Sequence, residues 1–118
     1  MVISNNPLVL RRFDGSLPVE GGPVEVFKKA LALLEEGAAL SGHSLSGSIR
    51  LTANPYRSIV VEPLEKGRLD KRGIVVLLDS IDRVESASRE RPVLQEVLRD
   101  YAYIDLDLLE SWFGCQEN

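Results

Sequence analysis

Polar residues that can bind an anion are concentrated between positions 42 and 58, where the chain reads GHSLSGSIRLTANPYRS. Backbone N–H groups of a Ser-Gly-Ser segment can converge on one point and form an anion-binding nest. Arginines beside it can add a planar fork that matches carboxylate or phosphate. We therefore predict a small-anion site. Together with an Asn pair near the N-terminus, its candidate residues are Asn5, Asn6, His43, Ser46, Gly47, Ser48, Arg50, Asn54, Tyr56, Arg57 and Ser58.

The same segment also has the alternation of a half-buried strand. Ser44, Ser46, Ser48 and Arg50 alternate with apolar or small residues, which is the period of a β-strand. Gly47 weakens such a strand and is typical of a bulge or of a close approach to the backbone. The two interpretations are compatible, because a hairpin can hold a ligand loop at its end, and the sequence leaves both open.

Few residues are suited to catalysis or metal binding. His43 is the only histidine and Cys115 the only cysteine, which excludes an intramolecular disulfide and multi-histidine or multi-cysteine metal sites within one chain. The chain contains no GxxxxGK[ST], GxGxxG or GxSxG motif. We expect no catalytic residue, no metal and no cofactor, and a small enzyme with His43 as general base is the third of three hypotheses.

Hydrophobic patterning predicts strands that alternate with helices. We expect short strands at 2–4 and 17–20, helical turns over 8–13, and a buried strand at 57–62 that ends at a proline. The clearest helix begins at Pro23, which suits the first helical position, and ends near Gly37, which suits a left-handed C-terminal turn. Another helix is expected to begin at Pro92.

Two segments in the second half of the chain are harder to assign. The run from Ile74 to Leu78 fits a core strand, but an apolar stripe of helical spacing continues to Val84, and we favour a helix over 69–84. Near the C-terminus we expect a short strand at 101–104 and then a helix capped by Asp105 or Asp107. The Trp112-Phe113 pair is expected to pack on the core; if exposed, it would indicate a protein interface.

These elements predict an α/β fold: one domain over residues 1–118, with a short, mostly parallel sheet flanked by helices in a Rossmann-like layering and a flexible tail at 114–118. Parallel sheets place ligands at the carboxyl ends of their strands. Asn5 and Asn6 follow the first expected strand directly, so the fold prediction places them at such an end.

Charge and hydropathy narrow the partners. The chain has 14 Lys and Arg against 18 Asp and Glu, a net charge of −4, and its basic pairs are scattered. Extended nucleic-acid binding is therefore not expected, because it needs a clustered basic surface. The longest apolar run, from Ile74 to Leu78, is far shorter than the ~20 residues that span a bilayer. With no secretory signal recognised, we expect a cytoplasmic protein that does not bind membranes.

Three segments resemble one known family. They read ISNNPLV at 3–9, GHSLSGSIRLTANPYRSIVV at 42–61 and YIDLDLLES at 103–111. In order and spacing the chain resembles the GrdX family, small proteins encoded beside glycine reductase components in amino-acid-fermenting anaerobic bacteria. Ser44 and Asn54 stand where the family pattern has proline and threonine.

The resemblance implies an accessory protein of a selenium-dependent reductase system that converts glycine, sarcosine or betaine to acetyl phosphate. It brings no catalytic role for the matching residues, which are Asn5, Asn6, His43, Gly47, Ser48, Pro55, Tyr56 and Ser58. The first hypothesis is therefore a non-catalytic accessory protein that binds a small anion or phosphorylated metabolite. The alternative is an adaptor that docks on a reductase subunit without a small ligand.

Overall fold

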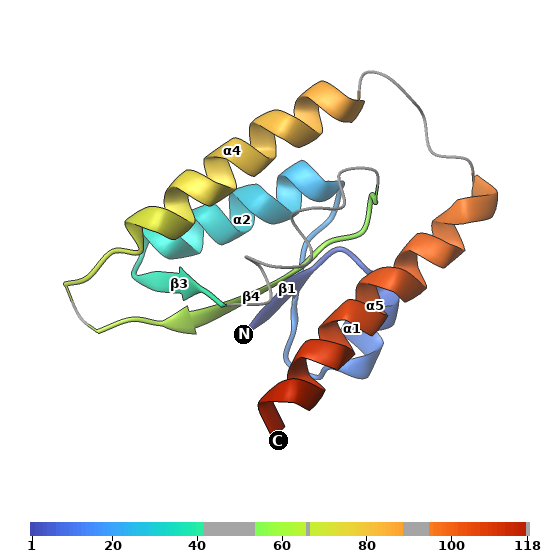
Figure 1. Cartoon of the computed structure of the whole chain (residues 1–118), viewed down its shortest axis with the longest axis horizontal. Helices are drawn as coiled ribbons and strands as arrows, with labels where there is room; N and C mark the ends of the chain where they lie inside the picture. Colours follow the sequence, from blue (N-terminus) through green and yellow to red (C-terminus); the bar gives the residue numbers. More distant parts are fainter. Residues whose placement is uncertain (42–53, 66, 89–94, 118) are drawn as a thin grey trace.

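A four-stranded sheet lies between two pairs of helices in the computed structural model, which describes residues 1–41, 54–65, 67–88 and 95–117 (Figure 1). The strands are β1 (Val2–Ser4), β2 (Leu17–Pro18), β3 (Ala38–Leu40) and β4 (Ser58–Pro63), in the order β2-β1-β4-β3. The helices within the described residues are α1 (Pro7–Arg12), α2 (Pro23–Glu35), α4 (Lys71–Ser88) and α5 (Gln95–Glu117).

The sheet is mixed and mostly antiparallel. β1 pairs parallel with β2, but β4 is antiparallel to both of its neighbours, β1 and β3. The α/β class is confirmed, whereas the prediction of a mostly parallel sheet is wrong. The error has a local cause: β3 reads Ala-Ala-Leu, without a β-branched or aromatic residue, so nothing in its composition indicated a strand beside β4.

Side chains of the two central strands alternate between the two helical layers. Ile3, Ile59 and Val61 belong to the apolar cluster with α2 and α4, while Val2 and Val60 belong to the cluster with α1 and α5. This follows from the two-residue period of a strand, in which neighbouring side chains point to opposite faces. Both faces of β1 and β4 are therefore buried, and neither strand shows the apolar–polar alternation of a sheet with one solvated face.

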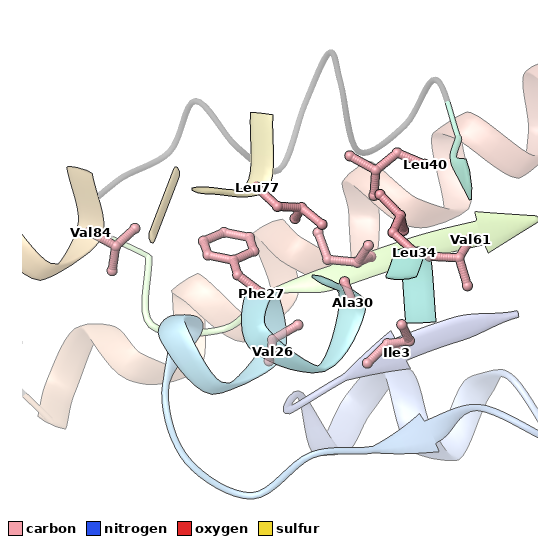
Figure 2. Packing of buried hydrophobic residues seen from close by; sticks show 10 residues of the cluster. Ile3, Val26, Phe27, Ala30, Leu34, Leu40, Val61, Leu77 and Val84 are labelled. Atoms are coloured by element: carbon pink, nitrogen blue, oxygen red, sulfur yellow. The ribbon is translucent and has the colours of Figure 1, made fainter. Parts of the chain in front are cut away.

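Helix α2 supplies the centre of the larger core. Its buried residues are Val26, Phe27, Ala30 and Leu34, all fully buried, at the spacing of one helical face (Figure 2). The backbone N–H of Gly22 donates to Glu25 Oε2 at 2.9 Å at the start of the helix. Gly37 follows its end with a φ of +111°, a conformation that glycine adopts without steric cost. The predicted start and end of this helix are confirmed.

Helix α4 settles the ambiguous segment in favour of a helix. Its buried positions, Gly73, Leu77, Ser80 and Val84, recur at spacings of four, three and four. Asp70 stands just before it and accepts from Gly73 N at 2.9 Å through Oδ1. Its other oxygen accepts from Leu40 N at 3.0 Å, so one carboxylate ties the start of α4 to the edge strand β3.

Helix α5 corrects the prediction for the C-terminal segment. Residues 101–104 are not a strand, and Asp105 and Asp107 lie inside one helix that continues to Glu117. Among the side chains of α5 whose burial is described, Ala102, Asp105 and Leu109 are buried, at spacings of three and four. Asp105 therefore faces inward and is not a helix cap. The predicted start of a helix at Pro92 lies outside the described residues.

The aromatic pair near the end of α5 packs as predicted. The ring of Phe113 lies 5.2 Å from that of Phe13, between ring centroids, and both tryptophan and phenylalanine pack against the cluster of Val2, Val9, Val60 and Leu109. No helix in the described part of the chain combines the length and apolar character needed to cross a bilayer.

Candidate functional site

Six of the predicted site residues come together where β1 ends and β4 begins: Asn5, Asn6, Asn54, Tyr56, Arg57 and Ser58. They meet because β1 and β4 are antiparallel, with Ser4 opposite Ser58, so the end of one strand lies beside the start of the other. The sequence-based prediction instead placed these residues at the carboxyl ends of parallel strands, which is not how β1 and β4 are arranged. The other five predicted residues, His43, Ser46, Gly47, Ser48 and Arg50, lie outside the described residues.

Asn5 holds three segments of backbone together. Its Nδ2 donates to the carbonyl oxygens of Gly21 at 3.0 Å and Pro55 at 2.9 Å, and its Oδ1 accepts from Arg57 N at 2.8 Å. The amide thus uses both donors and an acceptor on main-chain groups. Its contacts link the end of β1 to the turn before α2 and to the turn before β4.

Asn6 joins the two helices on the other face of the sheet. Its Oδ1 accepts from Leu8 N at 3.0 Å, which caps the first turn of α1. Its Nδ2 donates to the carbonyl oxygen of Ala102 at 2.8 Å and to Asp105 Oδ2 at 3.0 Å, both on α5. The side chain is fully buried, so it fixes α1 against α5 from inside the protein.

A chain of hydrogen bonds runs from Asn6 to Asp105 through two serines. Asn6 N donates to Ser4 Oγ at 2.9 Å, the two serine hydroxyls lie 2.9 Å apart, and Ser58 Oγ donates to Asp105 Oδ2 at 2.6 Å. Because Ser58 gives its proton to the carboxylate, the proton between the serines comes from Ser4. The short final distance is typical of a hydroxyl bound to an ionised carboxylate.

Arg57 carries a buried positive charge at the same place. It is fully buried, its Nε donates to Asn54 O at 3.0 Å, and its guanidinium carbon lies 5.8 Å from the centre of the Phe27 ring. Burial lowers the pKa of Arg57 from its usual value to about 10, while the negative charge of Asp105 acts to raise it. The guanidinium therefore remains protonated at neutral pH.

These hydrogen-bonded residues at the end of β1, the start of β4 and the inner face of α5 are called the polar cluster below. Its members are Ser4, Asn5, Asn6, Asn54, Arg57, Ser58 and Asp105. Asn54 completes it, since its Nδ2 donates to Tyr101 O at 3.0 Å and its Oδ1 accepts from Tyr56 N at 2.9 Å. The hydroxyl of Ser58 is buried and hydrogen-bonded, which is unsuitable for attack on a substrate. Among the residues that the structure describes, no three His, Cys, Asp or Glu side chains gather to hold a metal ion.

Sequence reasoning missed Ser4 and Asp105, although their signals were present. Ser4 is the last residue of β1 and is fully buried beside two predicted site residues. Asp105 interrupts the apolar face of α5 at an inward position, 2% exposed. A carboxylate on a buried helical face indicates a polar partner inside, but this is visible only when the segment is recognised as one helix.

A hollow opens on the outer side of the polar cluster. It has a volume of about 460 Å³ and lies between α1 and α5, with Tyr56 in its lining. We call it the α1–α5 hollow; its lining residues are Pro7, Leu8, Arg11, Tyr56, Arg99, Ala102 and Tyr103. Ala102 connects the hollow to the polar cluster, because its carbonyl oxygen accepts from Asn6 Nδ2. Of the six predicted site residues that the structure describes, only Tyr56 lines this hollow.

These features define a small mixed α/β protein with a buried polar cluster behind a surface hollow. The model of one protein family, described as GrdX-like protein, matches residues 1–114. The chain belongs to the GrdX-like family, and the resemblance found in its sequence is confirmed. Membership suggests an association with glycine reductase-type systems. No curated protein and no solved structure matches the chain.

Proposed function

We propose that this protein is a non-catalytic accessory protein of a glycine reductase-type system, and that it binds a small anion in the α1–α5 hollow. One observation carries the anion-binding part of the proposal: the lining includes two arginines, Arg11 and Arg99, and two tyrosines, Tyr56 and Tyr103. The association with the reductase system rests on family membership.

The lining suits a carboxylate or a phosphate. Guanidinium groups bind such anions through paired N–H donors, and phenolic hydroxyls add single donors. No acidic side chain is among the described residues that line the hollow, although the chain as a whole carries a net charge of −4. Its volume falls within the range of roughly 300–1,000 Å³ that is typical of small-molecule sites. A small carboxylated or phosphorylated metabolite is the ligand class that we expect.

A second hollow supports this choice by contrast. It has a volume of about 330 Å³ and lies between the end of α2 and the segment after β4. Its described lining includes Glu35, Glu36 and Glu65 together with Arg68. Three carboxylates disfavour an anion there. Of these two concavities in the described part of the chain, the α1–α5 hollow is the one whose charge fits an anionic metabolite.

The polar cluster holds α1 and α5, the two helices that line this hollow, in a fixed relative position. Asn6 caps α1 and donates to the carbonyl of Ala102, so the helices that carry Arg11 and Arg99 are joined by one buried side chain. A site built from two helices binds well only when their relative position is held by such supporting contacts. The predicted residues of the cluster thus contribute indirectly, by positioning the elements that line the site.

Thermal unfolding in the presence of candidate ligands tests the proposal. Wild type, the double variant Arg11→Gln/Arg99→Gln and the control Arg68→Gln are each melted with phosphate, acetyl phosphate, glycine and betaine. A ligand at a hundredfold excess over its dissociation constant stabilises the fold by about 2.7 kcal/mol, several degrees in a domain of this size. We expect one anion to raise the melting temperature of wild type and the control, with the shift lost in the double variant.

If the anion raises the melting temperature of the double variant as much as that of wild type, the anion does not bind in the α1–α5 hollow. If no compound raises the melting temperature of wild type, the result favours the second candidate function, an adaptor that docks on a reductase subunit without a small ligand. It is favoured by the exposed apolar side chains of α5, since Tyr103 is 51% and Ile104 44% exposed. Loss of binding to a purified reductase component in Ile104→Asp would then support docking through α5.

A further inference from the structure

The two tyrosines in the lining of the α1–α5 hollow take no part in the aromatic packing of the fold. Tyr56 lies just before β4, and Tyr103 lies on α5, where it is 51% exposed. Among the described residues, neither phenol hydroxyl has a hydrogen-bond partner, and neither ring packs against another aromatic ring. The rings of Phe13 and Trp112, in contrast, both pack against Phe113, with centroids 5.2 Å and 4.9 Å away. The hollow therefore offers two tyrosine rings to a ligand.

Hydrogen bonds fix the backbone of Tyr56 on both sides. Its own N–H donates to Asn54 Oδ1 at 2.9 Å. Asn5 holds the neighbouring groups, since its Nδ2 donates to the carbonyl oxygen of Pro55 at 2.9 Å and its Oδ1 accepts from Arg57 N at 2.8 Å. Of the described residues 54–57, Tyr56 is the one that lines the hollow. A side chain on a backbone held in this way loses little conformational entropy when a ligand contacts it.

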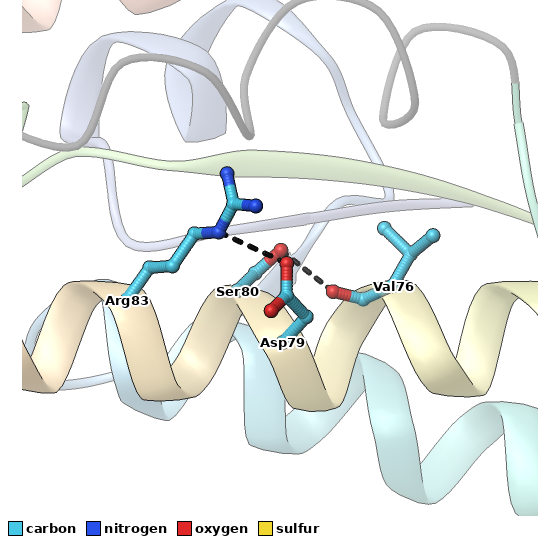
Figure 3. A network of polar contacts seen from close by, with 4 residues as sticks. All are labelled: Val76, Asp79, Ser80 and Arg83. Atoms are coloured by element: carbon cyan, nitrogen blue, oxygen red, sulfur yellow. Dashed lines mark hydrogen bonds and ion pairs between the residues drawn. The ribbon is translucent and has the colours of Figure 1, made fainter.

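Polar side chains of α4 provide a comparison for the arginines of the hollow. Arg83 forms an ion pair with Asp79 at 3.0 Å, one helical turn away (Figure 3). Ser80 Oγ donates to the carbonyl oxygen of Val76 at 2.7 Å in the same part of the helix. Each of these groups is satisfied by a neighbour on its own helix and needs no ligand.

The two arginines of the hollow have no acidic partner among the described residues. Arg11 Nε donates to the carbonyl oxygen of Pro7 at 3.3 Å, which leaves its other N–H donors available. Arg99 forms neither a hydrogen bond nor an ion pair within the described part of the chain. Guanidinium donors for an anion and tyrosine rings for a flat group therefore line the same hollow.

We propose that the ligand of the α1–α5 hollow is a flat aromatic or heteroaromatic ring that carries a phosphate or carboxylate group. This inference rests on the proposed function, because it takes the anion site as its starting point and adds the chemistry of the rest of the ligand. Arg11 and Arg99 bind the anionic group through their N–H donors. Tyr56 and Tyr103 contact the ring, and such aromatic contacts stabilise a complex beyond the burial of apolar surface.

The size of the hollow favours a ligand larger than a bare anion. A water molecule occupies about 30 Å³ of the liquid, so the volume of about 460 Å³ corresponds to roughly fifteen water molecules. An inorganic phosphate fills a small part of this space. Pro7 and Leu8 add apolar surface to the lining, which suits a ring better than a second charged group.

Two matched pairs of ligands test the inference by isothermal titration calorimetry on the wild-type protein. One pair is phenyl phosphate and cyclohexyl phosphate, the other is benzoate and cyclohexanecarboxylate, and inorganic phosphate is the reference. The members of a pair share their charge and their number of carbon atoms, so apolar burial alone gives no preference for the flat ring. We expect the flat member of at least one pair to bind about three- to tenfold more tightly than the saturated member.

The outcomes separate this inference from the proposed function. Equal affinities within both pairs, or tighter binding of the saturated members, would overturn the flat ring. If that binding is also lost in Arg11→Gln/Arg99→Gln, the anion site itself is supported. If neither inorganic phosphate nor any member of the two pairs binds wild type, the proposed anion site is wrong and this inference is overturned with it.

Two variants at one position test the contribution of a single ring. Tyr103→Leu removes the ring and Tyr103→Phe keeps it, and both should melt close to wild type because Tyr103 is half exposed. We expect the preference for the flat ligand to fall to about twofold or less in Tyr103→Leu and to remain in Tyr103→Phe. The affinity of Tyr103→Leu for inorganic phosphate should stay within about threefold of wild type. A Tyr103→Leu variant that keeps the full preference would overturn the contact between this ring and the ligand.

Discussion

The two best-defined regions of the molecule are held together by different chemistry. Between the sheet and helices α2 and α4, the core consists of apolar side chains, with Phe27, Leu34 and Leu77 fully buried. Where β1 ends and β4 begins, the interior is occupied by the polar cluster, with Arg57 and Asp105 buried in it. The stability of the first region depends on how well apolar side chains fill its volume. The stability of the second depends on hydrogen bonds between particular donors and acceptors.

The difference predicts how each region responds to substitution. An apolar core accepts changes that conserve volume, because its contacts are non-directional. In a buried hydrogen-bond network, the loss of one member leaves its partners without water and without a bond. We therefore expect the polar cluster to tolerate substitutions less well than the apolar core, although it buries fewer apolar groups.

The largest effect is expected at Asp105. Replacement by alanine removes the acceptor of Asn6 Nδ2 and Ser58 Oγ and the negative charge that acts on Arg57. Removal of one member of a buried charged group typically costs about 3–5 kcal/mol of unfolding free energy. Urea unfolding measures it. The control Asp107→Ala, two residues further along α5 and exposed, should stay within about 0.5 kcal/mol of wild type. Equal effects of the two variants would show that the cluster has no special sensitivity.

An intermediate effect is expected at the closest approach of α4 to α2. A Cβ added at Gly73 would lie against the carboxylate of Asp70 and 2.8 Å from a methyl group of Leu34. Alanine ordinarily stabilises a helix interior by about 1 kcal/mol relative to glycine. Overpacking costs more, so we expect Gly73→Ala to lower the unfolding free energy by about 1–3 kcal/mol.

Gly114 is the matched position for that experiment. It lies in α5, where an added Cβ would meet no atom of the described residues within 4 Å apart from the adjacent helix backbone. Gly114→Ala should therefore raise the unfolding free energy by about 0.5–1 kcal/mol, the effect of helix propensity alone. Calorimetric melting of both variants separates the two contributions. Stabilisation by both substitutions would mean that the α2–α4 contact has room for a methyl group.

The smallest effect concerns pH and Arg57. Since burial lowers the pKa of Arg57 to about 10 in the folded protein, the unfolded chain holds more protons than the folded protein only above about pH 10, up to the usual pKa of an arginine. The contribution of Arg57 to stability should therefore rise with pH in that window and stay constant below it. We expect the difference in unfolding free energy between wild type and Arg57→Met to be flat from neutral pH to about pH 9. A slope in that range would indicate a second titrating group coupled to Arg57.

Local signals in the sequence were sufficient for much of the fold. Val2–Ser4 and the helix from Pro23 were predicted with their observed bounds or within a residue of them, because short β-branched runs and a proline-started apolar stripe have few alternatives. The strand at 57–62 was shifted by one residue. Strand direction was wrong, because β3 is three residues long and its pairing with β4 is decided by tertiary contacts.

The candidate site was predicted in part for the same reason. Polar residues around Asn5 and Arg57 were recognised from their types, and the structure brings them together. Asp105 was interpreted as a helix cap, since a carboxylate is rarely placed in a helical core without a partner, and its partners Asn6 and Ser58 are distant in sequence. The pairing of Arg11 with Arg99 around one hollow likewise depends on how α1 meets α5, which no local pattern encodes.

The position of β1 in the sheet also constrains when the protein can fold during synthesis. Val2 lies opposite Val60, so β1 is synthesised well before β4 and waits for this central neighbour until β4 has emerged. At about 5–20 residues per second, that wait lasts several seconds. Throughout it, an apolar strand and the α2 stripe are present without their partners. The nascent chain is therefore most exposed to aggregation and chaperone binding before residue 63 is released, and codon changes that slow translation between β3 and β4 should lower the soluble yield without altering the folded protein.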